Sequence, residues 1–254
     1  MNYPAPDTFR KPNKIPLRQS AFLLDVHTHS IASGHYTSDT VTDMARFAAS
    51  RGIKLLGISE HGPALPHACT LSYFRGLSHA PSVRMGIRIL YGAEVNILDA
   101  SGSLDLPEDI RGKLDYCIAG IHSPCFGAPH SADYTDVYIR AMVNPHIHII
   151  AHPDDAKYPV DYRRLTEAAM DCHVLLEINN ASLSPDGYRG AAKENDRAIL
   201  ETCKKYRYPV LLSSDSHGHS DIGNFKYALD LVRETAFPAE LILNTSAERF
   251  LRFL

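Results

Sequence analysis

The sequence predicts an α/β barrel of parallel strands. Seven short apolar runs recur along the chain, and amphipathic stretches with helical spacing separate most of them. The runs are rich in Leu, Ile and Val and are bounded by turn residues, as buried parallel strands are. They cover residues 21–27, 54–61, 88–95, 116–122, 147–152, 174–180 and 209–216. Such a repeat fits an open sheet or a barrel, and the count of seven favours the barrel.

The helical stretches are defined by their spacing and by their ends. Residues 40–50 repeat apolar side chains at helical spacing, follow Ser38-Asp39 and precede Gly52. Similar patterns cover residues 131–143, 161–172, 193–206 and 224–236, and residues 246–254 form a short last helix. We therefore expect one barrel domain over residues 21–254, preceded by an extended, Pro-rich arm at residues 1–20.

Composition narrows the class of protein. The net charge is −3 and no basic cluster stands out, which disfavours nucleic acid as a partner. Five cysteines without a C-x-x-C pair indicate reduced thiols rather than a disulfide frame. No apolar run reaches membrane-spanning length, and prolines interrupt the start of the chain where a signal peptide would be apolar. We expect a cytoplasmic protein without a membrane partner; the sequence carries no signal for an oligomeric state.

Each predicted strand is apolar along most of its length and ends, at its C-terminus, in polar or titratable side chains. In α/β barrels, that end is where the βα loops assemble the functional site. In chain order these ends are Asp25-Val26-His27-Thr28-His29, Glu60-His61, Glu94, His122, His152, Asn179-Asn180 and Asp215-Ser216-His217. The sequence therefore predicts a metal site at the C-terminal ends of the strands.

The spacing of these residues supports metal binding. His27 and His29 lie two positions apart, so on a strand both side chains face the same way, and Asp215 and His217 repeat this arrangement. Imidazole and carboxylate ligands together suit Zn²⁺, Mn²⁺ or iron better than Mg²⁺ or Ca²⁺, which prefer oxygen. Taken alone, each residue has another interpretation, such as a polar rim residue, a salt-bridge residue or a packed core histidine. Six strand ends that bear His, Asp or Glu on one face favour the metal site.

The same segments resemble the PHP superfamily, which is named for polymerase and histidinol phosphatase, and in particular its single-domain bacterial phosphatases. The resemblance spans nearly the whole chain after the first twenty residues. It rests on DVHTHSIASGH (25–35), GISEHGP (57–63), GAEVNI (92–97), IAGIHSP (118–124), HIIAHP (148–153), LEINNAS (176–182) and SSDSHG (213–218).

The resemblance implies a distorted (β/α)7 barrel that holds three divalent metal ions. It implies that the first ion is bound by His27, His29, Glu94 and Asp215, the second by Glu94, His122 and His152, and the third by His35, His61 and His217. His35 enters only through the resemblance, because it lies in the loop after the first strand. The family uses zinc, iron and manganese; we expect Zn²⁺, with Mn²⁺ or iron as alternatives.

Such a centre predicts a hydrolase, and the resemblance favours a phosphatase acting on a small phosphorylated metabolite. Two ions that share a carboxylate can hold a bridging hydroxide and clamp an in-line displacement at phosphorus. The expected catalytic residues are Glu94, Asp215 and His217. The expected substrate-binding residues are Asn179, Asn180, Arg189 and Asn195, although Arg189 is equally compatible with a solvated loop charge.

Two other hydrolase classes stay open from the sequence. Amidohydrolase-like C–N or C–O hydrolases also carry H-x-H on a barrel strand, but they commonly bridge their metals with a modified lysine, and here Glu94 fills that place. A PHP-type nuclease acting on phosphodiesters is disfavoured by the acidic balance of the chain. A purely structural metal site is the least favoured interpretation, because nine ligands for three ions leave coordination positions open.

Overall fold

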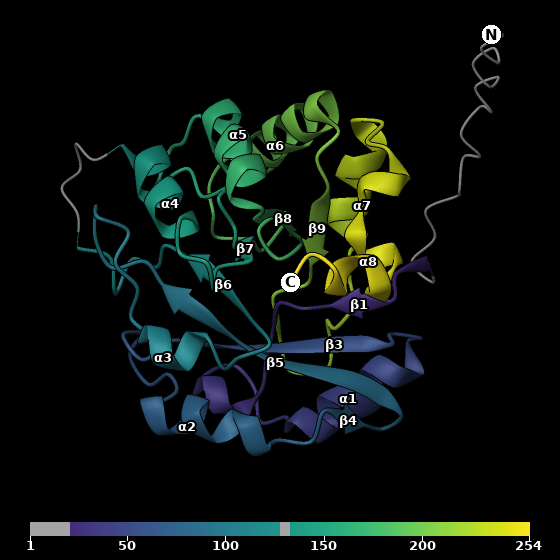
Figure 1. The fold of residues 1–254 in the computed structure, drawn as a ribbon. Helices are drawn as coiled ribbons and strands as arrows, with labels where there is room; N and C mark the ends of the chain where they lie inside the picture. Colours follow the sequence, from purple (N-terminus) through teal and green to yellow (C-terminus); the bar gives the residue numbers. More distant parts are fainter. Residues whose placement is uncertain (1–20, 128–132) are drawn as a thin grey trace, which may run out of the picture.

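The structure is a computed structural model that describes residues 21–127 and 133–254. Seven parallel strands form a nearly closed barrel with helices around it (Figure 1). Neighbouring strands follow the order β1 (Leu24–Asp25), β3 (Leu55–His61), β5 (Ile87–Asn96), β6 (Tyr116–Gly120), β7 (Ile149–Ile150), β8 (Leu175–Asn179) and β9 (Val210–Ser213). The predicted barrel of seven strands is confirmed.

The parallel register brings the polar strand ends to one rim. Asp25 pairs with Leu56 on β3, and His61 at the end of β3 pairs with Glu94 on β5. The short strand β4 (Val83–Arg84) adds an antiparallel edge to β5, which the sequence prediction omitted.

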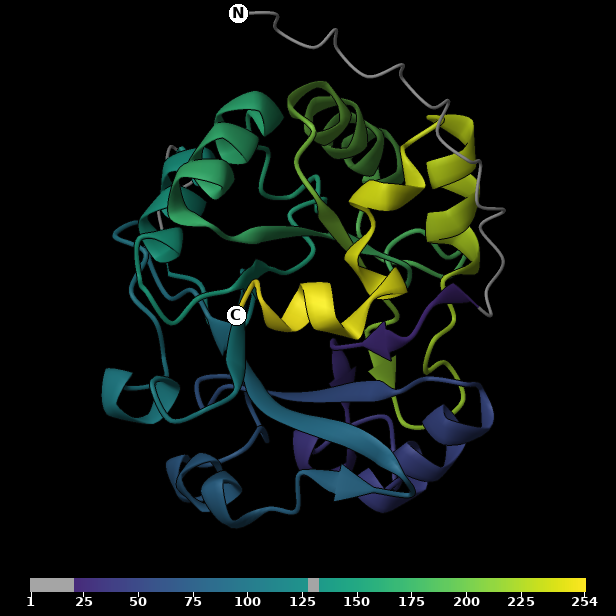
Figure 2. The ribbon, with the colours of Figure 1, turned by 45° about the vertical axis from the view of Figure 1, so that its right-hand side comes forward.

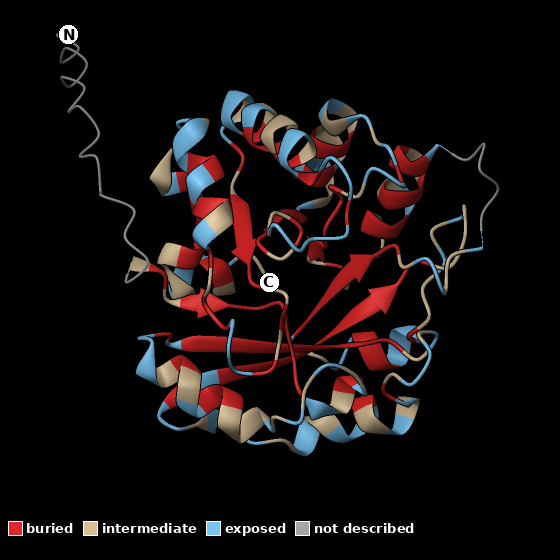
Figure 3. Ribbon diagram, turned by 180° about the vertical axis from the view of Figure 1, so that it is seen from behind, coloured by how far each residue is buried: buried red, intermediate tan, exposed pale blue. Residues whose placement is uncertain are grey.

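Helices cover the outside of the barrel, with their exposed faces outward and the strands buried within (Figure 3). They are α1 (Val41–Ser50), α2 (Leu71–Gly76), α3 (Glu108–Arg111), α4 (Tyr134–Met142), α5 (Tyr162–Cys172), α6 (Ala192–Tyr206), α7 (Lys226–Glu234) and α8 (Ala247–Leu251). Helix α1 begins one residue later than the Ser38-Asp39 start suggests, because Thr40 and Asp43 form a capping box. Helices α2 and α3 were not predicted, because they span only six and four residues.

The end of the barrel opposite the polar rim is filled by apolar side chains. Phe250 from α8 is fully buried and packs in one cluster with Leu24, Leu55 and Leu211 from the strands. Figure 2 shows α8 crossing the middle of the view, over the strands. The last helix therefore closes one end, so that the opposite end is the one left for a site.

The first and last strands of the barrel are joined by a seam rather than by a continuous ladder. The buried side chain of Asn244 donates to the carbonyls of Leu24 (3.1 Å) and Leu212 (2.7 Å), and it accepts from the Leu212 N–H (2.8 Å). Closer to the polar rim, β2 (Thr28–His29) pairs with β10 (Ser216–His217) in parallel. We call these contacts of Asn244, β2 and β10 the barrel seam.

The expected N-terminal arm at residues 1–20 lies outside the described residues. Among the helices that the structure describes, none combines the length and the apolar character needed to cross a membrane.

Candidate metal centre

A cavity of about 930 Å³ opens at the polar rim of the barrel. It is lined by the predicted ligands Glu94 and Asp215 and by several of the predicted metal-binding histidines. Loops form its mouth. The cavity is lined by these members of the predicted metal set: His35, His61, Glu94, His122, Asp215 and His217. His27, His29 and His152 lie beneath them and are almost fully buried.

The metal-binding atoms of four of these side chains are spaced like the ligands of a tetrahedrally coordinated ion. The Nε2 atom of His27 lies 3.2 Å from Glu94 Oε2 and 3.4 Å from Asp215 Oδ1, and His29 Nε2 lies 3.4 Å from each of the same two oxygens. An ion bound at about 2.0–2.1 Å in tetrahedral geometry separates its ligand atoms by roughly 3.3–3.4 Å. The spacing of these residues therefore fits a metal ion.

Glu94 presents its second oxygen to a different set of histidines. The Oε1 atom lies 3.1 Å from His122 Nε2 and 2.8 Å from His152 Nε2. His61 Nδ1 lies 2.8 Å from the first oxygen, Oε2. A carboxylate with histidines on both oxygens is placed to bridge two cations.

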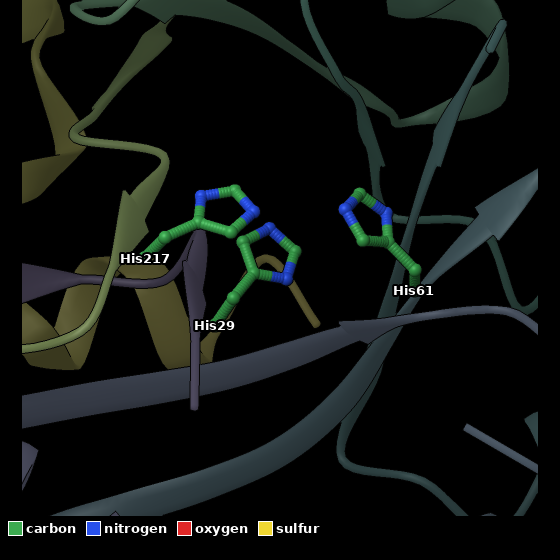
Figure 4. Close-up of side chains that lie close together, drawn as sticks. All are labelled: His29, His61 and His217. Atoms are coloured by element: carbon green, nitrogen blue, oxygen red, sulfur yellow. The ribbon is translucent and has the colours of Figure 1, made fainter. Parts of the chain in front are cut away.

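A further group of histidines lies closer to solvent. The rings of His61 and His217 each stack on His29 with centroids 4.4 Å apart, and Figure 4 shows these three rings gathered from different strands. The Nε2 atoms of His35 and His217 are 3.1 Å apart. The atoms of His29, His61 and His217 lie close enough together to hold an ion, as do those of His27, His29 and Glu94 and those of His61, Glu94 and His122.

Acceptors behind the rings orient the histidines toward the centre. His27 Nδ1 donates to Glu177 Oε1 (2.6 Å), and His122 Nδ1 donates to Asn96 Oδ1 (2.7 Å). The Nδ1 atom of His35 lies 2.9 Å from the carbonyl of Ser33. Holding Nδ1–H in this way leaves Nε2 free to bind a metal, as is usual for metal-ligating histidines.

The pKa shifts of two carboxylates and two histidines suit cation binding, whereas nearby carboxylates, against the effect of burial, raise the pKa of His27 and His61. Burial opposes ionisation of Glu94 and Asp215, but nearby histidines outweigh it and hold both carboxyl pKa values well below their usual range. Burial lowers the pKa of His29 well below its usual value and that of His152 to about 4. At neutral pH these two rings are neutral, which is the form that binds a metal.

Two of these side chains sit on strained backbone. His152 has φ 34° and Asp215 has φ 52°, in the left-handed region that residues other than glycine seldom adopt. Tyr36, beside His35, has φ 59°. Such strain gathers at functional sites, where the surrounding structure holds it in place.

The predicted substrate-binding residues divide into two pairs. Arg189 and Asn180 line the cavity, and Arg189 Nη1 lies 3.5 Å from Asp215 Oδ2. Asn179 donates to Asp215 Oδ2 (3.1 Å) and to Glu177 Oε2 (3.0 Å). Asn195 donates to the carbonyl of Asp154 (2.7 Å) and is not among the described residues that line the cavity.

Sequence reasoning overlooked several residues of this site. Glu177 is a buried carboxylate within β8, and an acidic residue inside an apolar strand was an available signal. The mouth includes the exposed rings of Tyr36 and Tyr188, and it also carries Asp155 and Asp186. These loop residues gave no signal, because their positions depend on loop conformation.

Comparisons with known proteins agree with this geometry. The model of the PHP domain matches residues 25–234. A probable phosphatase of Clostridium novyi is 39% identical over 234 residues, covering 92% of this chain and 94% of its own. A probable phosphatase of Acetivibrio thermocellus is 38% identical over 229 residues, covering 90% and 93%.

Solved structures share the fold at low sequence identity. The histidinol phosphate phosphatase of Lactococcus lactis, solved with zinc, L-histidinol and phosphate, superposes with a TM-score of 0.57 at 17% identity, covering 85% of this chain and 94% of that one. A chain of an archaeal ribonuclease P also reaches a TM-score of 0.57, at 14% identity, with 91% and 90% covered. Because the PHP domain model and the two probable phosphatases match most of the sequence, the chain belongs to the PHP domain family.

Proposed function

We propose that the protein hydrolyses small-molecule phosphomonoesters with the help of three divalent metal ions. The family match and the relatives support a metal-dependent phosphatase of the PHP family. The substrate class, the number of ions and the identity of the ions go beyond this and form the proposal. The proposal depends chiefly on the position of Glu94. Its two carboxylate oxygens face different histidines, and it lines an open cavity.

The proposed ligand sets are those that the family resemblance implies, and the spacing within the first two sets supports them. His27, His29, Glu94 and Asp215 would hold the first ion, Glu94, His122 and His152 the second, and His35, His61 and His217 the third. Zinc is the first choice, because nitrogen and carboxylate ligands suit it and the Lactococcus lactis structure contains it; Mn²⁺ and iron are the alternatives. When bound, such ions lower the pKa of water and stabilise negative charge on a phosphoryl group.

Arg189 supplies a fixed positive charge within this cavity. Its guanidinium is buried, donates to Ser182 Oγ (2.9 Å) and stacks on Tyr188 with 4.7 Å to the ring centroid. Held in this way, its planar group can bind two phosphoryl oxygens without first having to be ordered. We assign Arg189 the role of binding and orienting the phosphoryl group.

The asparagines of the site have separate roles in this proposal. Asn180 Oδ1 accepts from the N–H groups of Tyr227 and Ala228, which fixes the side chain with its amino group as the donor available to substrate. Asn179 donates to Asp215 Oδ2, so its side chain orients that carboxylate. Direct substrate binding by Asn179 and by Asn195 stays a prediction.

Glu94, Asp215 and His217 are the proposed catalytic residues, because they line the cavity where the phosphoryl group would sit. Asp215 is held in one orientation by Asn179 and by the nearby Arg189, which fixes Oδ1 toward His27 and His29. The Asp215 carboxylate is thus oriented toward the proposed first ion.

The mouth of the cavity favours a small substrate over nucleic acid. Asp155, Asp186 and Asp221 line it, whereas Arg189 is the one Lys or Arg among its described lining residues. A nucleic-acid strand requires several cationic contacts to its phosphates. The acidic mouth therefore fits a single phosphoryl group on a neutral or cationic alcohol better than a polyanion.

The proposal is tested with purified protein loaded with Zn²⁺ or Mn²⁺. We expect phosphate release from para-nitrophenyl phosphate and from a panel of metabolite monoesters, and slower turnover of bis-para-nitrophenyl phosphate. Glu94→Gln should abolish release, whereas Glu167→Gln, a change at a side chain 42% exposed on α5, should preserve it. Full activity of the Glu94 variant, faster turnover of the diester, or fewer than two ions per active chain would contradict the proposal.

A further inference from the structure

The proposed third ion differs from the others in how its ligands are held. His61 belongs to the long strand β3, but His35 and His217 come from segments 182 positions apart, and both are only partly buried. By contrast, His27 and His29 are enclosed by the barrel. Strand β10 already holds His217 beside His29 of β2, whereas His35 lies in a loop, so the third site depends on what keeps the His35 loop against β10.

Asp39 and His219 form a two-point contact between these segments. Asp39 Oδ2 accepts from the backbone N–H of His219 (2.7 Å) and lies 2.6 Å from its Nδ1. Asp39 follows His35 by four positions, and His219 follows His217 by two. The contact thus ties the two ligand-bearing segments close to the ligands themselves.

Gly218 allows the two segments to approach. It has φ +99°, and a Cβ at this position would lie 2.5 Å from Thr37 Oγ1 and 2.7 Å from Asp39 Oδ2. Its N–H donates to the carbonyl of His29 (2.9 Å), which fixes the segment to β2. A side chain at position 218 would push the two segments apart.

The far side of the contact is anchored on helix α1. The ring of His219 packs edge-on against Phe47, with centroids 5.1 Å apart. Arg51 lies over the same phenylalanine ring and donates to the carbonyl of Ile222 (2.8 Å). At its other end, the Asp39 carbonyl accepts from the Ile31 N–H (2.8 Å), which closes the base of the His35 loop.

We propose that Asp39 and His219 are positioning residues that preorganise the third metal site by holding His35 against His217. The proposal rests on the three-ion assignment made above. Without the contact, binding of the ion would have to order both segments, and that entropy cost would fall on this ion alone. Losing a partner that is hydrogen-bonded directly to a metal ligand commonly lowers metal affinity by about 10–100-fold, and this contact acts on the ligands one step further away.

The test is a titration of the metal-free protein with Zn²⁺ against a chromophoric chelator. For Asp39→Ala we expect two zinc affinities equal to wild type and a third that is weaker by about 10-fold, the lower end of the range for a direct partner of a ligand. Asp39→Asn keeps an oxygen acceptor for His219 and should stay within a few-fold of wild type. The matched control is Asp161→Ala, which removes the N-cap side chain of α5 and does not touch α1, Asp39 or His219. It should keep all three affinities.

The outcomes separate the two proposals. If wild type binds fewer than three zinc ions, the three-ion assignment is wrong and the positioning role falls with it. If wild type binds three and Asp39→Ala binds three equally well, only the positioning role is wrong. Equal weakening of all three ions with a lower melting temperature would also overturn it. Gly218→Ala provides a second variant that disturbs the same contact from the opposite segment, should Asp39→Ala fail to fold.

Discussion

Glu177 orients ligands of two proposed ions at once. Its Oε1 accepts from His27 Nδ1 (2.6 Å), and its Oε2 accepts from the backbone N–H of His152 (2.7 Å). Burial raises the pKa of this carboxyl, but the charge on His27 outweighs that effect and the pKa is lowered. Glu177 is therefore a carboxylate that is held ionised beneath the candidate metal centre and does not line the cavity.

Removing this carboxylate is expected to weaken metal binding. In Glu177→Ala the His27 ring loses the acceptor that fixes its orientation, so zinc affinity should fall by about 10–100-fold. Glu177→Gln retains one oxygen acceptor and should lose less. The measurement is zinc affinity together with kcat/KM, with the exposed Glu167→Gln as control. Wild-type zinc affinity in Glu177→Ala would show that His27 needs no orienting partner.

Arg189→Met is expected to reduce phosphatase activity without releasing metal. The variant loses the one fixed guanidinium beside Asp215, so kcat/KM should fall by about 10²–10³ with the metal content unchanged. Arg189→Lys restores the charge but not the planar group, and should recover only part of the loss. Steady-state kinetics and metal analysis check this, with the exposed Arg163→Met on α5 as control. Unchanged kinetics in Arg189→Met would remove the arginine from the phosphoryl site.

Asn244→Ala is expected to destabilise the protein strongly. The side chain satisfies two backbone groups of Leu212 and one of Leu24, all inside the barrel seam. A buried polar group left unpaired costs about 1–3 kcal/mol, so we expect a loss of about 3 kcal/mol or more in the free energy of unfolding. Urea denaturation measures it, and Asn144→Ala, where one hydrogen bond in a turn is lost, is the control. A loss no larger than that of the control would mean that the seam is held by other contacts.

The buried carboxyl of Asp196 should make the free energy of unfolding of the protein depend on pH. It is fully buried, and among the described residues neither carboxyl oxygen has a hydrogen-bond partner. Burial first, and then the charge of Asp154, raise its pKa well above its usual 3.8. The folded state therefore keeps a proton that the unfolded state has already lost, so stability falls as pH rises above 3.8 and levels off above the folded pKa.

Asp196→Asn should weaken this dependence, because Asp154, whose pKa burial raises to about 7, still contributes in the same direction. The variant should be more stable than wild type at pH 8, with a smaller gain at pH 5. Urea denaturation at both pH values checks this. Asp230→Asn, at an exposed position on α7, should gain nothing from the higher pH. A variant that is less stable than wild type at pH 8 would show that the ionised carboxylate is stabilised by a partner.

The sequence was most informative where chemistry and periodicity coincide. Polar side chains at the ends of apolar runs placed His27, Glu94 and His152 on one rim, because parallel strands bring their C-terminal ends together. His35 was recognised only through the family resemblance, because a loop position has no periodicity. The ligand assignments themselves stay predictions, which the metal titrations decide.

Long-range contacts were beyond sequence reasoning. Nothing near Asn244 shows that it joins strands whose residues lie 32 and 220 positions away. The single predicted run at 209–216 becomes two strands, β9 and β10, because Asp215 breaks the ladder with its left-handed backbone. The Asp39–His219 contact depends in the same way on how two loops fold back.

Because the proposed first metal site lies across the barrel seam, a bound ion would also stabilise the closed barrel. His27 and His29 stand on one side of this join and Asp215 on the other, so a cation bound by all three fastens the first strand to the last. Chelation would then loosen the barrel along one line rather than evenly, and amide exchange should rise first on both flanks of β2 and β10. The ion that takes part in the reaction would therefore also hold the first and last strands of the barrel together.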